Sequence, residues 1–171
     1  HVARITIRYK QKMSIEKAII EDAKELTELT MRSKSYWGYS EQQIKDWKND
    51  LTITEAYILE NEVYKLINEN KVSGYYSFFK SNNSDFNLDN LFVAPISIGK
   101  GIGKKLMIDF FKRILKTEFE RVILDADPNA EKFYSHLGFK VIWKLETSIE
   151  NRYLPVMEIN KSGVQEYVQR H

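Results

Sequence analysis

The feature that most constrains this chain is a glycine-rich stretch between an apolar run and a helical pattern. Of seven glycines in the sequence, Gly99, Gly101 and Gly103 fall within five residues. The apolar run at residues 88–93 predicts a buried strand before them. After them, large apolar residues recur at helical spacing over a wide face, at Ile102, Leu106, Phe110 and Ile114. The order is therefore strand, glycine-rich turn, helix.

This turn has the properties of a phosphate-binding loop. Glycines let backbone N–H groups approach an anion, and the first amides of a helix and its dipole favour phosphate. Three lysines add positive charge. A glycine-rich turn without a ligand is the alternative. The predicted cofactor-binding residues of the loop are Ile98, Gly99, Lys100, Gly101, Ile102, Gly103, Lys104 and Lys105.

Two common nucleotide-binding loops do not fit the spacing. A Walker loop needs Gly at position 98 and Ser or Thr at position 105, where the chain has Ile98 and Lys105. A dinucleotide fingerprint that starts at Gly99 needs Gly at position 104, where the chain has Lys104. The loop must therefore belong to another class of phosphate site.

Length and composition predict one globular domain. The chain has 171 residues, of which 43% are apolar and 29% charged. Without cysteine it has no disulfide, thiol chemistry or cysteine-based metal site, and only His136 is an internal histidine, so we expect no metal. No apolar run approaches the roughly 18 residues of a membrane span. We expect a cytoplasmic protein that does not bind membranes.

The first 12 residues differ in charge from the rest. Four of the 26 basic residues lie there, which leaves 22 basic against 24 acidic residues in the remainder. We expect residues 1–12 to be an expression-derived addition or a misassigned start, followed by a domain at 13–160 and a tail at 161–171. A basic arm for nucleic acid is a weak alternative, because no aromatic-rich basic face accompanies it. We therefore predict no nucleic-acid binding.

The remaining elements follow from periodicity and capping signals. Strands are predicted at 16–20, 63–67, 72–79, 86–93, 121–126, 139–145 and 155–159. Capping boxes at 22–25 and 40–43 begin two helices, with an aromatic loop at 33–39 between them. Asp127, Pro128 and Gly138 bound a helix after strand 121–126. That strand should lie parallel to 86–93 through a right-handed crossover.

Residues 127–139 carry a second signature, which contains Ala130, Phe133 and Tyr134 followed by Gly138 and Phe139 (A-x-x-F-Y-x-x-x-G-F). Together with the glycine loop, in this order and at this distance, it resembles the GNAT N-acetyltransferase superfamily. The resemblance covers roughly residues 14–160.

The loop signature of that superfamily is usually written Q/R-x-x-G-x-G/A. Gly101 and Gly103 match it, whereas Ile98 occupies the Gln/Arg position. This departure removes a polar contact to the cofactor but leaves the backbone amides in place.

The resemblance implies an α/β (α+β) fold with a mixed, mostly antiparallel sheet of six or seven strands and helices on both faces. It implies acetyl-coenzyme A as co-substrate, with transfer of the acetyl group to a primary amine by direct attack in a ternary complex. The fourth and fifth strands of this fold splay apart. Pantetheine would then bind along Leu91, Phe92 and Val93, and an N–H near Val93 would stabilise the carbonyl oxygen.

Roles for single residues follow from the same resemblance. Tyr134 is the expected proton donor to the thiolate; otherwise it is a core aromatic. Asp89 is the expected base; otherwise it is a surface carboxylate. Asn129 either bonds the cofactor or caps a helix. His136 lies two residues beyond Tyr134, on another side of the helix, and we expect it to pack or face solvent rather than act as a base.

The family's first helices cover the acceptor pocket, and this region of the chain contains Tyr36, Trp37 and Tyr39. We expect these aromatic residues to bind substrate rather than only pack. The acceptor is an amine on a small molecule or a protein, with a small molecule preferred. A homodimer is possible on this reading. The function of a different class is a coenzyme A-binding sensor or interaction module with little catalysis, for which Ile98 leaves room.

Overall fold

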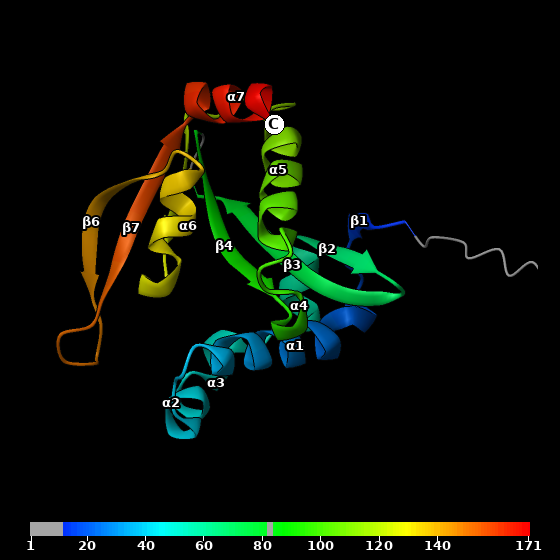
Figure 1. Cartoon of the computed structure of the whole chain (residues 1–171), viewed down its shortest axis with the longest axis vertical. Coiled ribbons are helices and arrows are strands. Elements are labelled where there is room, and N and C mark those ends of the chain that lie inside the picture. Colours follow the sequence, from blue (N-terminus) through cyan, green and yellow to red (C-terminus); the bar gives the residue numbers. More distant parts are fainter. Residues whose placement is uncertain (1–11, 82–83) are drawn as a thin grey trace, which may run out of the picture.

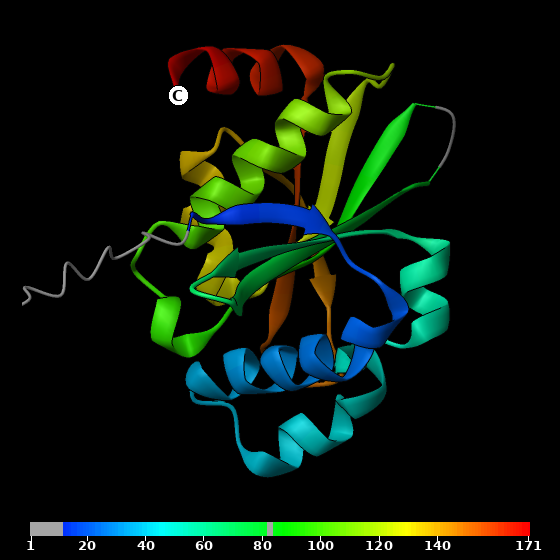
Figure 2. The same cartoon turned by 90° about the vertical axis from the view of Figure 1, so that its right-hand side faces the viewer.

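The structure is a computed structural model that describes residues 12–81 and 84–171. It contains a seven-stranded sheet in the order β1-β2-β3-β4-β5-β7-β6 with helices on both faces (Figures 1 and 2), which confirms the predicted fold class. The strands are β1 Ser14–Lys17, β2 Glu62–Asn68, β3 Lys71–Lys80, β4 Asp85–Val93, β5 Arg121–Asp125, β6 Lys140–Glu146 and β7 Tyr153–Asn160. The α-helices are α1 Ala23–Tyr36, α2 Glu41–Asp46, α3 Lys48–Leu51, α4 Glu55–Glu60, α5 Ile102–Ile114, α6 Glu131–His136 and α7 Lys161–Arg170.

The sheet divides between β4 and β5. These strands run parallel, as predicted, but they pair only where residues 85–87 of β4 meet residues 121–123 of β5. Beyond that point β4 pairs with β3 through Val93, while β5 pairs with β7 through Asp125. The expected splay is therefore present, and residues 88–93 have one backbone edge without a neighbouring strand.

A β-bulge interrupts β4 next to this split. Ser77 of β3 lies opposite Asn90, and the next residue, Phe78, lies opposite Leu88. Asp89 is therefore the extra residue of the bulge. Because a bulge bends its strand and redirects a side chain, the irregularity decides where the Asp89 carboxylate points.

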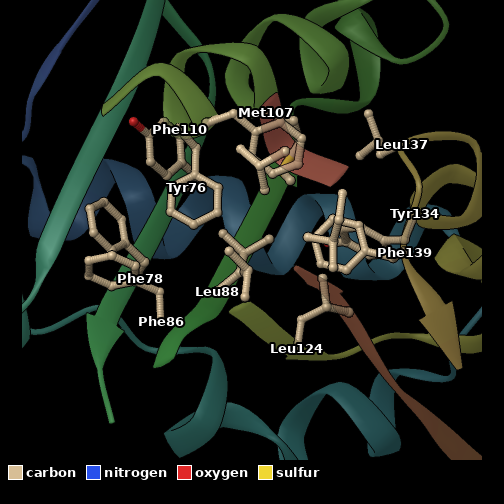
Figure 3. Close-up of a cluster of buried hydrophobic side chains, with 14 of the residues drawn as sticks. Tyr76, Phe78, Phe86, Leu88, Met107, Phe110, Leu124, Tyr134, Leu137 and Phe139 are labelled. Carbon is tan, nitrogen blue, oxygen red and sulfur yellow. The ribbon is translucent and has the colours of Figure 1, made fainter. Parts of the chain in front are cut away.

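Two hydrophobic clusters hold helices against the two faces. The larger cluster lies under α5, α6 and α7, and Figure 3 shows Phe110, Met107 and Tyr76 within it. The apolar face predicted for α5 is confirmed, because Ile102, Leu106, Phe110 and Ile114 are all buried. The smaller cluster joins α1 and α4 to β2 and β3. Helices from both faces thus reach the split between β4 and β5.

The first strand and first capping box were predicted wrongly. The strand is Ser14–Lys17, and Ile20–Asp22 forms a 3₁₀ turn instead of the end of a strand. Asp22 does not cap α1 through its side chain. Its carboxylate accepts from the backbone of Ile19 (2.8 Å) and from the buried Lys65 ammonium (2.7 Å). An ion pair with a distant strand thus replaces the local cap, whereas the box of Ser40 and Gln43 is confirmed.

The segment predicted as a tail is helix α7. Asn160 caps it by accepting from the Gly163 backbone (2.8 Å), and Val164 is fully buried. The Tyr167 ring packs edge-on against Phe111, with 5.8 Å between centroids. The predicted extension at 1–12 lies outside the described residues apart from Lys12. In the part of the chain that is described, no helix has the length and apolar character to cross a membrane.

Gly74 allows α5 to approach the sheet closely. A Cβ at this position would lie 2.9 Å from Leu106 Cδ1 and 2.9 Å from the Phe92 backbone oxygen. Because the backbone of a central strand cannot yield easily, we expect Gly74→Ala to destabilise the protein by about 1–3 kcal/mol in urea unfolding. Lys71→Ala, at the exposed start of the same strand, should change stability by less than about 0.5 kcal/mol. Equal urea-unfolding midpoints for the two variants would show that α5 does not pack tightly against Gly74.

Candidate active site

A cavity of about 500 Å³ occupies the split between β4 and β5. Its walls come from β4, the glycine loop, the carboxyl end of β5, α6 and the end of α1. Most of the predicted site residues line it, namely Trp37, Asp89, Leu91, Phe92, Val93, Ile98, Gly99, Gly101, Ile102, Gly103, Lys104, Asn129 and Tyr134. Lys100, Lys105, Tyr36 and Tyr39 do not belong to this lining.

The glycine loop presents free amides to the cavity. Gly99 and Gly101 have φ values of 79° and 77°, in the left-handed region that suits glycine. The first bond of α5 runs from the Lys105 N–H to the Gly101 oxygen (3.1 Å). The preceding amides of Ile102, Gly103 and Lys104 have no acceptor inside the helix, so they can bind an anion.

The other loop positions serve different purposes. A Cβ on Gly103 would lie 3.3 Å from the Phe133 ring, so this glycine permits close packing between α5 and α6. Ile98 is half-buried and places an apolar side chain on the cavity wall. Of the loop lysines, Lys104 lines the cavity, whereas the Lys105 ammonium lies 3.3 Å from Met13 Sδ.

Tyr134 combines a buried ring with a hydroxyl free to donate. The residue is 7% exposed, and its ring packs edge-on against Phe133 and Phe139 at 5.2 and 5.6 Å between centroids. Figure 3 shows it between Leu137 and Leu124 in the core. Among the described residues its hydroxyl has no hydrogen-bond partner. Burial, followed by the negative charge of Asp127, raises the pKa of Tyr134, so the group stays protonated near neutral pH.

Asp89 is held by its neighbours on one oxygen. Its Oδ2 accepts a hydrogen bond from the Tyr57 hydroxyl and a longer one (3.5 Å) from the Asn90 amide. The Tyr57 hydroxyl also bonds to Ser77 Oγ (2.8 Å). Burial and the bond to Asp89 raise the pKa of Tyr57, which therefore remains a donor. The bulge and α4 together fix the carboxylate at the cavity wall.

Asp125 is a second carboxylate on this wall, and sequence reasoning missed it. It ends β5, opposite Val156 of β7, and lines the same cavity as Asp89. Neither a hydrogen bond nor an ion pair joins its carboxylate to another described residue. The carboxylate is open to the cavity, but surrounding atoms remove part of its hydration. Partial burial, and then the charge of Asp89, raise the pKa of Asp125. An acid at the end of the strand beside the splay was the available signal.

Asp127 joins three parts of the chain at one end of the cavity. It pairs with Lys34 of α1 (2.5 Å) and, at 3.6 Å, with Arg152 from the β6–β7 connection. It also accepts from the Tyr39 hydroxyl (2.9 Å) and the Asn129 backbone (2.9 Å). Burial alone would raise the pKa of Asp127, but the Lys34 and Asn129 hydrogen bonds and the Lys34 charge outweigh it and lower the pKa.

The aromatic residues predicted to bind substrate separate into two groups. Trp37 lines the cavity, and Tyr36 packs edge-on against it at 5.2 Å while 54% exposed. Tyr39 instead bonds to Asp127, and its ring packs against Trp47 at 5.0 Å. The Asn129 amide also bonds to Asp127 (3.0 Å), so its first role is to brace this network.

Comparison with known proteins agrees with this geometry. The family described as "Acetyltransferase (GNAT) domain" matches residues 38–160. The chain belongs to this family. An "Uncharacterized N-acetyltransferase ycf52" of Gracilaria tenuistipitata var. liui is 24% identical over 102 residues, which are 60% of this chain. Those residues span 55% of the length of that relative.

Solved structures share the GNAT fold. The PaiA N-acetyltransferase of Thermoplasma acidophilum, solved with coenzyme A, superposes with a TM-score of 0.73 and 21% identity over 87% of this chain and 99% of its own. YncA of Salmonella typhimurium, a putative acetyltransferase solved with acetyl-coenzyme A, gives a TM-score of 0.63 at 18% identity over 88% and 94%. In the part of this chain that the structure describes, no cluster of His, Cys, Asp and Glu could hold a metal ion.

The Lys34–Asp127 pair should contribute to stability. Its side chains are 14% and 19% exposed, so removing one partner leaves a poorly hydrated charge. We expect Lys34→Met to lower the free energy of unfolding by about 1–3 kcal/mol. Lys24→Met is the matched control, because its pair with Glu28 is exposed and should contribute below about 0.5 kcal/mol.

The same pair predicts a pH dependence. The pKa of Asp127 is lower in the folded than in the unfolded state, so its contribution is present above about pH 4 and disappears as pH falls through the folded pKa. Urea unfolding at neutral and acid pH should therefore show less acid destabilisation in Lys34→Met than in the parent protein. An identical acid loss in both proteins would contradict this assignment.

Proposed function

We propose that this protein transfers the acetyl group of acetyl-coenzyme A to a primary amine by direct attack in a ternary complex. One observation carries the proposal: a single cavity joins the loop amides, the unpaired edge of β4 and Tyr134. These groups suit the phosphate, the pantetheine and the thioester of one extended molecule. A cytoplasmic location accompanies the proposal, because the enzyme must meet acetyl-coenzyme A there.

The described residues fit this co-substrate. The amides of Ile102, Gly103 and Lys104 bind the pyrophosphate, and the Lys104 ammonium adds charge beside them. The backbone of residues 91–93 lacks a strand on its β5 side, so it can bond the pantetheine amides as it would a neighbouring strand. Its side chains Leu91, Phe92 and Val93 line the cavity and exclude water there.

Tyr134 supplies the proton that the departing thiolate needs. Its raised pKa means that the hydroxyl is protonated throughout the working pH range. The same shift makes full proton transfer to sulfur less favourable than for an unperturbed tyrosine. The hydroxyl therefore acts first as a hydrogen-bond donor to the developing negative charge, and full transfer follows as the carbon–sulfur bond breaks.

The acceptor end of the cavity favours a cation. Asp89 and Asp125 line it, and among the described residues neither pairs with a lysine or arginine. Asp127 is already neutralised by Lys34 and Arg152. An alkylammonium group on a small molecule or on a protein side chain matches this charge. A small molecule remains the preferred acceptor.

A coenzyme A-binding module with little catalysis is the second candidate. It is favoured by Ile98, which places an apolar side chain where the family's loop motif has Gln or Arg. The two candidates separate in an assay of thiol release from acetyl-coenzyme A across a panel of amines. Amine-dependent release supports the enzyme, whereas tight binding without release supports the module.

Cofactor binding should depend on the backbone at Gly101. Its φ of 77° is strained for any β-branched residue, although nothing lies within 4 Å of an added Cβ. We expect Gly101→Val to turn the following amides away and to weaken coenzyme A binding at least tenfold in calorimetric titration. Ile96→Ala, which is in the same loop but 80% exposed and outside the lining, should bind like the parent. Unchanged affinity in Gly101→Val would contradict the loop assignment.

The Tyr134→Phe variant distinguishes the acetyltransferase from the coenzyme A-binding module. The ring and its packing remain, so affinity for acetyl-coenzyme A should barely change. Loss of the donor should lower kcat by about 10²–10⁴-fold, with the KM for acetyl-coenzyme A nearly constant. Tyr153→Phe, an exposed tyrosine outside this cavity, is the matched control. If Tyr134→Phe turns over like the parent, water is the proton source and the tyrosine is only a core residue.

A further inference from the structure

We propose that Asp125 takes the proton from the acceptor amine, while Asp89 holds the ammonium group in place. This division of labour rests on the proposed acetyltransferase function. It assigns to Asp125 the role of base that the sequence suggested for Asp89. The assignment depends on three observations: where the two carboxylates lie, what each is bonded to, and which charges face them.

The two carboxylates lie on opposite sides of the split between β4 and β5. Asp89 belongs to the β4 bulge and Asp125 to the carboxyl end of β5, beyond the point where these strands pair. Both line the cavity that also contains the Tyr134 side chain. An amine that approaches the thioester between the strands therefore meets one carboxylate from each side.

Asp89 and Asp125 differ in their side-chain hydrogen bonds, and this difference assigns their roles. Asp89 Oδ2 is occupied by the Tyr57 hydroxyl, with the Asn90 amide at 3.5 Å. The hydrogen bond from Tyr57 fixes the direction of the Asp89 carboxylate, which suits it to hold a cation. The Asp125 carboxylate accepts no hydrogen bond from any described residue, so both of its oxygens are available to a proton.

The surrounding charges reinforce this difference. The other charged groups that line the cavity with Asp125 are Asp89 of β4, Asp127 of the turn after β5, Lys34 of α1 and Lys104 of α5. Asp127 is neutralised by Lys34 of α1 and by Arg152 of the β6–β7 connection, and Tyr134 of α6 is uncharged. Among the described residues no lysine or arginine pairs with Asp89. Partial burial, and then the charge of Asp89, raise the pKa of Asp125. Paired acids whose environments differ in this way commonly divide into a charged partner and a proton carrier.

The proton and bond changes balance. The bound ammonium gives one proton to the Asp125 carboxylate, and the resulting amine attacks the thioester carbon. The carbon–nitrogen bond forms, the carbon–sulfur bond breaks, and the thiolate takes the Tyr134 hydroxyl proton. The second nitrogen proton returns to the Tyr134 oxygen, and Asp125 releases its own proton to water. No other reactant is required.

Two nucleophiles test the role of Asp125. n-Butylamine is almost fully protonated at neutral pH and needs a base, whereas hydroxylamine is largely unprotonated and does not. We expect Asp125→Asn to slow acetyl transfer to n-butylamine by about 10²–10⁴-fold but transfer to hydroxylamine by no more than about threefold. Raising the pH should restore transfer to n-butylamine, because the free amine then becomes abundant. Coenzyme A affinity, measured by calorimetry, should remain that of the parent.

Asp89→Asn and a control complete the comparison. Asp89→Asn should raise the KM for n-butylamine more than it lowers kcat. Asp50→Asn, on the exposed surface of α3, should behave like the parent. Equal losses with both nucleophiles in Asp125→Asn would reduce Asp125 to a structural role. Unchanged transfer to n-butylamine in Asp125→Asn would overturn the proposal. So would a slowed transfer to n-butylamine, but not to hydroxylamine, that occurs only in Asp89→Asn.

A measurement without turnover keeps this test separate from the proposed function. Carbon-13 NMR of the aspartate carboxyl groups follows their protonation directly. The titration midpoint of Asp125 should lie above that of an ordinary aspartate and should fall in Asp89→Asn. An ordinary, unshifted midpoint would remove the physical basis for the assignment. If the shift is present but the parent acetylates neither amine, the acetyltransferase proposal fails instead.

Discussion

The structure depends on the incomplete pairing of β4 with β5. Three residues of each strand pair, and then the two strands diverge toward different neighbours. Divergence leaves the backbone polar groups of residues 88–93 without a strand partner on one side, and such groups require hydrogen bonds from elsewhere. It also opens the cavity lined by residues of α1, α5 and α6. The proposed binding surface for the co-substrate and the proposed reaction site thus arise from the same interruption of the sheet.

Electrostatics then gives three nearby acids different properties. Asp127 has cationic partners on α1 and on the β6–β7 connection, and its pKa falls. Asp125, two residues earlier, has no such partner among the described residues. Partial burial, and then the charge of Asp89, raise the pKa of Asp125. Asp89 is bonded to Tyr57 within a β-bulge. Residue type and sequence position alone would not distinguish these carboxylates, because the distinction comes from what each one faces.

Local patterns gave reliable predictions where an element is stabilised by its own residues. The strand before the glycine loop, the loop itself and the buried face of α5 are confirmed, because periodicity and glycine conformation act over a few residues. The same reasoning failed at Asp22, where an ion pair with Lys65 across 43 residues replaced a helix cap. It failed again at α7, whose Val164 gains its burial from the core rather than from its own helix.

The sequence by itself determined the family, the fold class and the position of the glycine loop. Two ordered motifs specify these, and each motif depends on neighbours a few residues apart. Only the tertiary structure decided that Tyr39 braces Asp127 instead of lining the cavity, and that Asp125 lies across the split from Asp89. The first pair of residues is 88 positions apart in the sequence, and the second is 36 positions apart. Their distances are set by helix packing and strand divergence, which short-range patterns do not encode.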